Sequence, residues 1–359
     1  MPNPPDARAV ALRILNILDS GQRTLDAVLE ETLSSERNLQ KRDIGLVQTL
    51  VFGVLRWRNR LDWVIDHFSK TPPKKIHPDV LNILRMGLFQ ILYLDRIPQS
   101  AAVNTAVELA KNASAKWTHR FVNGLLRNAI RNLDSLPCPS PETDSALALA
   151  VSQSFPKWLI KRWIDRFGLE ETRRLCEAIN SIPPIPLRVN TLRMDREQLM
   201  GILQDQVGAI APSRFSPVGL TFMNPESAIP ELPGFPEGWF QVQDEAAQLV
   251  GCHLNPQPGD HVLDACAGLG GKTGHIAQMM NNRGRVLALD HSSEKLKRLR
   301  HEMDRIGATI VSTRTHDLAI PPTPKKFGTF DRILLDAPCS GLGVVRRNPD
   351  TKWRIFPSD

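Results

Sequence analysis

The chain has 359 residues, of which 42% are hydrophobic and 23% charged, and this composition excludes a disordered or fibrous protein. No apolar run approaches the ~18 residues of a membrane span, and the N-terminus lacks the apolar stretch of a signal peptide. The net charge is +7, and residues 1–135 hold most of it, with 19 Lys and Arg against 13 Asp and Glu. A basic module beside a near-neutral one is compatible with a nucleic-acid-binding domain joined to a catalytic domain, although many basic proteins bind no nucleic acid.

The five cysteines are scattered along the chain, with no Cys-x-x-Cys pair. This pattern argues against a disulfide framework and a structural zinc site, and it favours a reducing cytosol. We therefore expect a cytoplasmic protein with no membrane segment and no metal.

The first predicted elements are helices. Apolar residues recur at helical spacing through residues 7–132, without the alternation of a strand. The longest helical runs cover residues 44–68, 80–94, 101–112 and 117–133. We predict an all-α bundle that forms a domain of residues 1–135.

The last of these helices carries a basic stripe. Its residues are spaced three or four apart and share one face, namely Lys116, Arg120, Asn123, Arg127 and Arg131. A solvated outer face is the simpler interpretation. A stripe that contacts nucleic-acid phosphates is the alternative, favoured by the basic charge of the whole module.

A linker and a small connector are expected next. Residues 134–145 are rich in Pro and Ser, and residues 136–150 are predicted to be a linker. Residues 151–237 are predicted to form a small α+β connector. Its expected elements are a helix at 156–180, a proline-rich break at 183–186, a strand at 187–191, a helix at 193–206 and a loop-rich stretch at 209–238.

From residue 238 the pattern changes to alternating strands and helices. Short apolar strands are predicted at residues 261–265, 285–290, 309–313 and 330–336, with helices from about residue 272 and over 292–306. This alternation is typical of a parallel, doubly wound sheet. Residues 238–359 are therefore expected to form an α/β domain.

A glycine-rich turn, residues 264–273, joins the first of these strands to its helix. Gly268, Gly270 and Gly271 permit a tight turn and the close approach of a ligand. The helix N-terminus behind them favours a negative group such as a carboxylate. The spacing fits neither a Walker A motif nor G-x-G-x-x-G, so the turn alone is weak evidence for a cofactor site.

Acidic residues follow the later strands. Asp290 ends the second strand about 20 residues after the glycines, where a carboxylate accepts hydrogen bonds from ribose hydroxyls. A helix cap or a surface position is the alternative role for it. Asp317 and Asp336 follow the third and fourth strands. These acids favour an adenosine-containing ligand, which leaves hydride transfer and methyl transfer from S-adenosylmethionine as candidate reactions.

Asp336 opens a further motif, Asp-Ala-Pro-Cys-Ser-Gly-Leu-Gly at residues 336–343. Together with the glycine-rich turn and Arg-Arg-Asn-Pro-Asp-Thr-Lys-Trp at residues 346–353, it resembles the RNA cytosine-5 methyltransferases, and most closely the bacterial 16S ribosomal RNA methyltransferase B family. Residues 44–133, 188–190 and 241–248 look like further family segments. The resemblance implies an all-α NusB-like RNA-binding domain, a small α+β connector and a Rossmann-like methyltransferase domain.

The resemblance also implies roles for individual residues. The S-adenosylmethionine-binding residues would be Cys266, Ala267, Gly268, Leu269, Gly270, Gly271, Lys272, Asp290, Asp317 and Asp336. Asp336 would also lie near the target base, and Cys339 would assist release of the product without being the main nucleophile. The RNA-binding residues are expected to be Lys116, Arg120, Arg127 and Arg131 of the stripe, with Arg188 and Asn190 of the family segment. Leu269 stands where the family usually has proline.

In this family the attacking cysteine belongs to a Thr-Cys-Ser motif after a fifth strand, and no such motif occurs in the 359 residues. We therefore expect the α/β domain to be truncated after its fourth strand. Its edge at Ile333, Leu334 and Leu335 would then be unpaired and prone to aggregation. Cys339 as the nucleophile is a further possibility, and the other cysteines are expected to be small core or loop residues.

The function implied is S-adenosylmethionine-dependent methylation of carbon 5 of a cytosine in 16S ribosomal RNA. The expected partner is 16S ribosomal RNA or a small-subunit assembly intermediate, and the expected state is a monomer. A catalytically inactive RNA-binding protein is the alternative, because the nucleophile segment is missing. A nicotinamide-dependent dehydrogenase would need a hydride-acceptor site that the sequence does not reveal.

Overall fold

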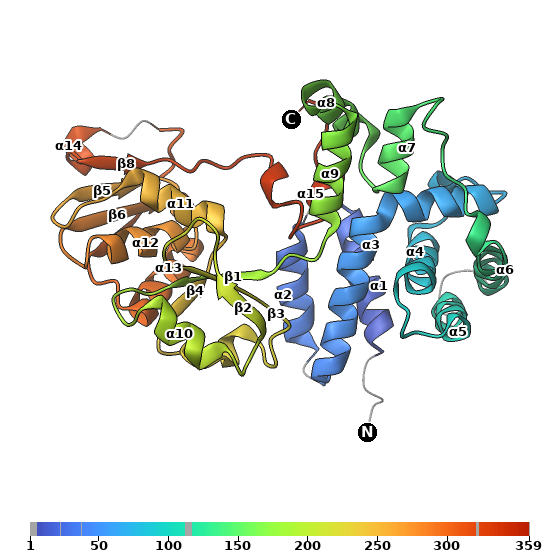
Figure 1. The fold of residues 1–359 in the computed structure, drawn as a ribbon, viewed down its shortest axis with the longest axis horizontal. Helices are drawn as coiled ribbons and strands as arrows, with labels where there is room; N and C mark the ends of the chain where they lie inside the picture. The colour runs from blue at the N-terminus through green and yellow to red at the C-terminus, as the bar shows by residue number, and fades with distance from the viewer. Residues whose placement is uncertain (1–5, 22, 37, 112–116, 321–322, 359) are drawn as a thin grey trace. The chain divides into compact units, whose positions relative to one another are not determined.

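A computed structural model describes residues 6–21, 23–36, 38–111, 117–320 and 323–358. The chain folds into two compact units (Figure 1). The helical unit comprises Met1–Ile182 and Ser340–Asp359, and the sheet unit comprises Pro183–Cys339. Within the described ranges, no helix combines the length and the apolar character needed to cross a membrane.

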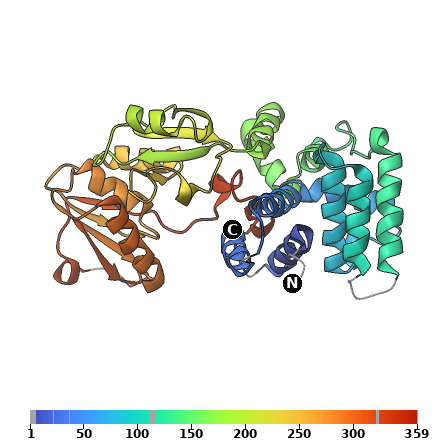
Figure 2. The same cartoon turned by 90° about the horizontal axis from the view of Figure 1, so that it is seen from below.

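The helical unit begins with the predicted bundle. Its helices are α1 (Ala7–Asp19), α2 (Leu25–Ser35), α3 (Lys41–Phe68), α4 (Pro78–Tyr93), α5 (Gln99–Lys111) and α6 (Thr118–Arg131). The four long runs expected from the sequence are thus confirmed to within a few residues. Helices α4, α5 and α6 lie side by side (Figure 2).

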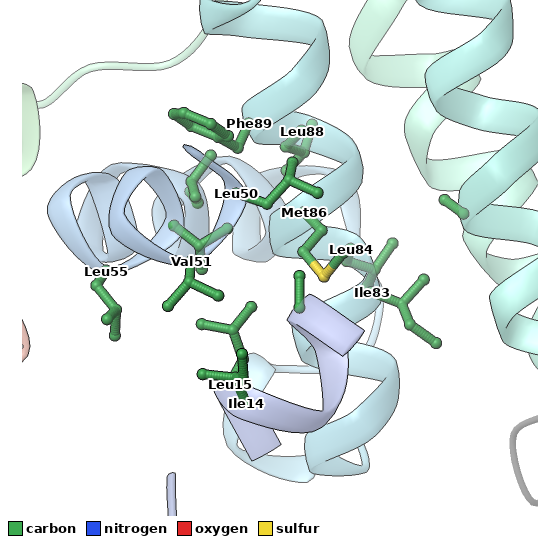
Figure 3. Packing of buried hydrophobic residues seen from close by; sticks show 14 of the residues in the cluster. Ile14, Leu15, Leu50, Val51, Leu55, Ile83, Leu84, Met86, Leu88 and Phe89 are labelled. Carbon is green, nitrogen blue, oxygen red and sulfur yellow. The ribbon is translucent and has the colours of Figure 1, made fainter. Parts of the chain in front are cut away.

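Aliphatic side chains from three of these helices meet in the core of the bundle. Ile14 of α1, Leu50 of α3 and Leu84 of α4 are fully buried there (Figure 3). Helices α3 and α4 approach closely because residue 53 is glycine, and a Cβ atom at that position would overlap the ring of Phe89. The periodicity of the sequence therefore corresponds to one contiguous apolar core.

Three further helices extend the helical unit, namely α7 (Ser145–Ser152), α8 (Lys157–Phe167) and α9 (Leu169–Asn180). The sequence prediction placed the start of α7 in the linker and placed α8 and α9 in the connector. In the structure they pack with the bundle, since Asn59 Nδ2 of α3 donates to Ala150 O at 2.9 Å and to Phe155 O at 3.1 Å. The predicted 136–150 linker and 151–237 connector therefore do not match the compact units.

The C-terminal segment also belongs to the helical unit, although residues 238–359 were predicted to form one α/β domain. It contains the short 3-10 helix η4 (Leu342–Val344) and the short helix α15 (Thr351–Arg354). Trp353 Nε1 donates to Leu55 O of α3 at 2.6 Å. The compact units therefore divide the predicted domain after Cys339, because contacts between residues about 300 positions apart leave no local pattern.

The sheet unit starts with an antiparallel sheet of strand order β2-β3-β1-β4. Its elements are β1 (Ile185–Val189), α10 (Arg196–Leu203), β2 (Gly208–Pro212), β3 (Gly219–Met223) and β4 (Phe240–Val242). Strands β2 and β3 correct the prediction of a loop-rich stretch at 209–238. The strands were missed because they are only five residues long and prolines surround them, while the buried Leu220 and Phe222 show their alternation.

A parallel sheet of order β7-β6-β5-β8 completes the sheet unit. Its elements are α11 (Glu245–Leu254), β5 (His261–Asp264), α12 (Gly271–Met279), β6 (Arg285–Asp290), α13 (Ser293–Ile306), β7 (Val311–Thr315), α14 (Pro324–Phe327) and β8 (Arg332–Leu334). The predicted α/β alternation is confirmed, although β7 begins two residues later than expected. Helices α12 and α13 pack on one face of the sheet through Ala277 and Leu296, and Phe327 packs on the other with Leu263.

Strand β8 lies at an edge of the described sheet, because it pairs with β5 alone. Ile333 and Leu335 are exposed at this edge, whereas Leu334 is buried.

Candidate active site

The candidate site lies where the parallel strands end. The register pairs Asp264 of β5 with Ala288 of β6 and with Leu334 of β8, and it pairs Asp290 of β6 with Thr315 of β7. Because parallel strands end at the same edge of the sheet, the loops after β5, β6, β7 and β8 gather there. These loops contain the acidic residues singled out in the sequence.

The glycine-rich turn is held against its neighbouring strands by backbone hydrogen bonds. Ala265 N donates to Leu334 O and Ala267 N donates to Leu289 O, each at 2.8 Å. Gly270 has a φ of +87°, in the left-handed region that glycine tolerates, and is the N-cap of α12. The turn therefore presents the N-terminus of α12 at the strand ends, as predicted.

Asp290 anchors the turn from the next strand. Its Oδ2 accepts a hydrogen bond from Gly268 N at 3.0 Å, and its Oδ1 accepts one from Ser292 N at 2.8 Å. The residue is 7% exposed. A carboxylate offers about four acceptor positions, so Asp290 retains capacity for a pair of ligand hydroxyls. The two roles considered for Asp290 are thus compatible. Its carboxylate accepts hydrogen bonds from the local backbone, and it can still accept hydrogen bonds from a ligand.

Asp317 follows β7 and lies next to Asp290 in the fold, because His316 N donates to Asp290 O at 3.1 Å. Its side chain is exposed, and Asp317 Oδ1 accepts from Ala319 N at 2.9 Å in a local turn. The structure therefore brings Asp290 and Asp317 to the same part of the strand edge.

Lys272 and Asp336 form an ion pair across the turn, with Lys272 Nζ 2.5 Å from Asp336 Oδ2. The two residues are 64 positions apart, and both were assigned to the cofactor site. Lys272 is in the first turn of α12, and Asp336 follows β8. The pairing orients the Asp336 carboxylate without burying it, since its side chain is 56% exposed.

Asp264 is a site residue that the sequence reasoning did not assign. It ends β5, is 1% exposed, and its Oδ2 accepts a hydrogen bond from Thr273 Oγ1 at 2.7 Å. Burial raises the pKa of Asp264 to about 6, against the smaller opposing effects of the Thr273 hydrogen bond and the Lys272 charge. The sequence signal that could have identified Asp264 is its position, because it is an acidic residue at the end of a strand and beside a glycine-rich turn.

The two cysteines near the site differ in environment. Cys266 is half-buried, and its pKa is raised by desolvation and by the negative charges of Asp290, Asp264 and Asp336. Its thiol therefore stays protonated near neutral pH, which fits a loop residue better than a nucleophile. Cys339 is exposed in the loop after Asp336, where a substrate can reach it.

The predicted RNA contacts fall into two groups. Arg120, Arg127 and Arg131 are exposed along α6, and Arg127 Nε donates to Asn123 Oδ1 at 2.9 Å. The predicted stripe is thus confirmed as a surface feature, while Lys116 lies outside the described residues. The buried Leu125 and Leu126 occupy the opposite side of the helix.

Arg188 and Asn190 are not available to RNA, and their predicted role as RNA contacts is wrong. Both are completely buried. Asn190 Nδ2 donates to Gly238 O at 2.7 Å and to Ile306 O at 2.8 Å. A local segment of sequence cannot show that these polar side chains face inward, because their partners are distant in the chain.

Arg188 joins the antiparallel sheet to α12. Its Nη1 donates to Gly271 O at 2.6 Å and its Nε donates to Gln278 Oε1 at 3.0 Å. Its other described acceptors are the side-chain oxygens of Gln241 and Gln243. Desolvation lowers the pKa of Arg188 to about 9. Arg188 therefore stabilises the glycine-rich turn through its hydrogen bond to Gly271 O.

Comparison with known proteins divides the sequence into three matches. Residues 5–131 match the NusB family, residues 155–228 match the ferredoxin-like domain of RsmF/B-like methyltransferases, and residues 251–359 match the 16S rRNA methyltransferase RsmB/F family.

Full-length relatives support the same assignment. The chain is 36% identical to the probable ribosomal RNA small subunit methyltransferase B of Synechocystis sp., over 98% of this chain and 78% of the relative. It is also 36% identical to the protein of the same name from Bacillus subtilis, over 98% of this chain and 77% of the relative. The crystal structure of PH0851 covers 99% of this chain and 79% of its own, with 24% identity and a TM-score of 0.78, and thus shares the fold.

Proposed function

The chain belongs to the 16S rRNA methyltransferase RsmB/F family, and from this premise we propose that it methylates carbon 5 of a cytosine in 16S ribosomal RNA, with S-adenosylmethionine as the methyl donor. The observation that carries the proposal is the glycine-rich turn held by Asp290, with Asp336 on the adjacent strand end. We further propose that the protein acts as a monomer in the cytoplasm, on free RNA or on an assembling small subunit.

The residues at the strand ends fit the proposed cofactor. A Cβ atom at Gly268 would have no neighbour within 4 Å, so the turn is open on that side, and Asp290 retains acceptor capacity. Residues 266–272 would hold the methionine part, Asp290 the ribose hydroxyls, and Asp317 the adenine side. Bound S-adenosylmethionine supplies an electrophilic methyl group.

Asp336 is proposed to act on the target base. Carbon 5 of cytosine is a weak nucleophile, and it becomes enamine-like when a thiolate adds to carbon 6. A carboxyl group that donates a proton to ring nitrogen 3 neutralises the negative charge that develops there during this addition. Lys272 keeps Asp336 in position through the 2.5 Å ion pair.

Cys339 is proposed to assist release of the methylated base. It is exposed in the loop that Asp336 begins, so the base that contacts Asp336 is within the reach of the same loop. The attacking cysteine is assigned, by family resemblance, to a Thr-Cys-Ser motif that residues 1–359 do not contain. The target cytosine must be unpaired or flipped out to reach these groups.

The exposed arginines of α6 support an RNA substrate. Arg120, Arg127 and Arg131 face solvent on one side of the helix, where phosphate groups can reach them. The helical unit would then bind the RNA backbone, while the strand edge of the sheet unit carries out the chemistry.

Transfer of labelled methyl groups to 16S ribosomal RNA by the complete gene product tests the proposal, with the modified base identified by nucleoside analysis. We expect 5-methylcytidine as the product. Asp336→Asn should lower kcat by on the order of 100-fold, and Asp290→Ala should raise the Kd for S-adenosylmethionine. Asp205→Asn, an exposed acid elsewhere in the sheet unit, is the matched control. Incorporation only at a base other than cytosine would contradict the proposal.

A further inference from the structure

The helical unit contains an exposed tryptophan beside a cavity. Trp117, immediately before α6, is 63% exposed. It lines a cavity of about 250 Å³, and the other lining residues include Phe121, Ile76, Val80, Lys75 and His77. These six residues define the Trp117 pocket. Its walls come from α6, the start of α4 and the segment that contains the short 3-10 helix η1 (Pro73–Lys75).

The floor of the Trp117 pocket is apolar and fixed. Ile76 and Val80 are buried in the bundle core. The rings of Trp117 and Phe121 lie 5.9 Å apart between centroids, with 61° between their planes. The indole of Trp117 is therefore held in place by its neighbours, and a flat ring can stack on its exposed face with little loss of side-chain conformational entropy.

The segments that form the Trp117 pocket carry positive charge, and Lys75 is one of the lining residues. Residues 69–77 include Lys70, Lys74 and Lys75 and contain no Asp or Glu, and Arg120 lies one turn along α6 from Trp117. All four cations are exposed, and none forms an ion pair with a residue in the described part of the chain. Asp79 is the nearby acid, and its Oδ2 lies 3.8 Å from His77 Nδ1. An aromatic face on segments that carry exposed cations suits a base flanked by phosphates.

We propose that the Trp117 pocket binds one unpaired nucleobase of the RNA substrate. The base stacks on the indole of Trp117, and the flanking phosphates contact Lys75 and Arg120. The positive charge of these segments favours this occupant over an apolar protein segment, which gains nothing from the four cations. The proposal rests on the proposed function for the identity of the RNA, and it adds a specific contact for single-stranded RNA far along the chain from the methylation motifs.

Binding of labelled oligouridylate of about 12 nucleotides, a length in the range of single-strand binding sites, tests the stacking contact. We expect Trp117→Ala to weaken binding about 10-fold, because loss of one stacked base costs on the order of 1–3 kcal/mol. Trp117→Phe should retain most of the affinity, since it keeps an aromatic face. Binding of an RNA duplex of the same length should not change, because its bases are already stacked.

Phe215→Ala is the matched control, since Phe215 in the sheet unit is also 63% exposed. Lys75→Gln should lower the slope of log affinity against log salt by about 1. The proposal would be overturned if Trp117→Ala and Phe215→Ala weakened oligouridylate binding equally. It would also be overturned if Trp117→Ala weakened duplex binding as much as oligouridylate binding, or left the affinity for oligouridylate unchanged. This binding assay needs no methyl transfer, so it tests the stacking contact separately from the proposed function. If RNA affinity depends on Trp117 but the protein does not methylate cytosine, the proposed function is rejected and the stacking contact stands.

Discussion

Asp264 shows how burial at one residue changes the chemistry of the site. Its carboxyl group is 1% exposed, and Thr273 supplies a hydroxyl hydrogen bond. Because burial raises the pKa of Asp264 to about 6 from its ordinary value of 3.8, the folded protein binds the proton more tightly than the unfolded chain. The contribution of Asp264 to stability is therefore present below pH 4 and is lost as the pH rises to about 6.

Asp264→Asn removes this dependence. We expect the variant to match the wild type near pH 4 and to be more stable by as much as about 3 kcal/mol at pH 7.5, because a neutral amide avoids the cost of a buried charge. Urea unfolding of both proteins across this pH range measures the difference. A stability difference that stays constant from pH 4 to pH 7.5 would show that Asp264 does not titrate there.

The glycines of the turn differ in what surrounds them, which permits a paired test. A Cβ atom at Gly270 would lie 2.7 Å from Leu299 Cγ and 3.1 Å from Met303 Cε, whereas one at Gly268 would meet nothing within 4 Å. Both residues have positive φ. Gly268→Ala should therefore cost only the backbone term of about 1 kcal/mol, and Gly270→Ala should cost about 3 kcal/mol with the added overlap. Equal losses of unfolding free energy would contradict this account.

At the scale of elements, the C-terminal segment is a structural part of the helical unit. Lys352 is 1% exposed, and its Nζ donates to Ser154 O at 2.6 Å and to Arg56 O at 2.7 Å. The same ammonium lies 4.0 Å from the ring centroid of Phe155. Burial lowers the pKa of Lys352. A segment that begins right after Cys339 thus completes the core formed by α3, α7 and α8.

Lys352→Ala should lower the stability of the helical unit by about 3 kcal/mol, because it leaves a cavity and removes the donor to Ser154 O. Hydrogen exchange at the amides of α3 near Arg56 measures this effect locally. Ser358→Ala is the control in the same segment, and we expect a change within about 0.5 kcal/mol, because its side chain is exposed. Unchanged exchange in Lys352→Ala would mean that the segment does not contribute to the core.

At the scale of the whole molecule, Arg188 unites two sheets that the sequence suggested as separate domains. Its guanidinium group donates to groups of both the antiparallel sheet and α12. Arg305 makes a second link, since its Nη2 donates to Phe240 O at 3.1 Å. The connector sheet and the parallel sheet are therefore one compact unit.

Arg188→Met separates a structural role from an RNA contact. We expect unfolding of the sheet unit to be easier by about 3 kcal/mol, since buried acceptors lose their donor. The slope of log RNA affinity against log salt should not change in Arg188→Met. In contrast, Arg127→Gln on the exposed face of α6 should lower that slope by about 1. A lower salt slope with Arg188→Met would restore the prediction that the structure overturned.

The sequence by itself determined most of the elements and most of the residues that gather at the candidate site. Helical periodicity located the bundle, because each helix must bury one apolar face, and alternating strands and helices located the parallel sheet. The motif residues of the strand ends, Asp290, Lys272 and Asp336, also come together as expected, because parallel strands end at one edge. These features depend on residues close in the chain.

Only the tertiary structure decided where the units divide and which polar residues face inward. Arg188 and Lys352 are long cations that resemble surface residues in the sequence, yet both are buried by partners 53 to 296 positions away. Distant contacts also placed residues 340–358 with the helices, and burial in the folded sheet unit raised the pKa of Asp264. The physical reason is that desolvation and hydrogen-bond partnership depend on the neighbours in space, which local sequence patterns do not encode.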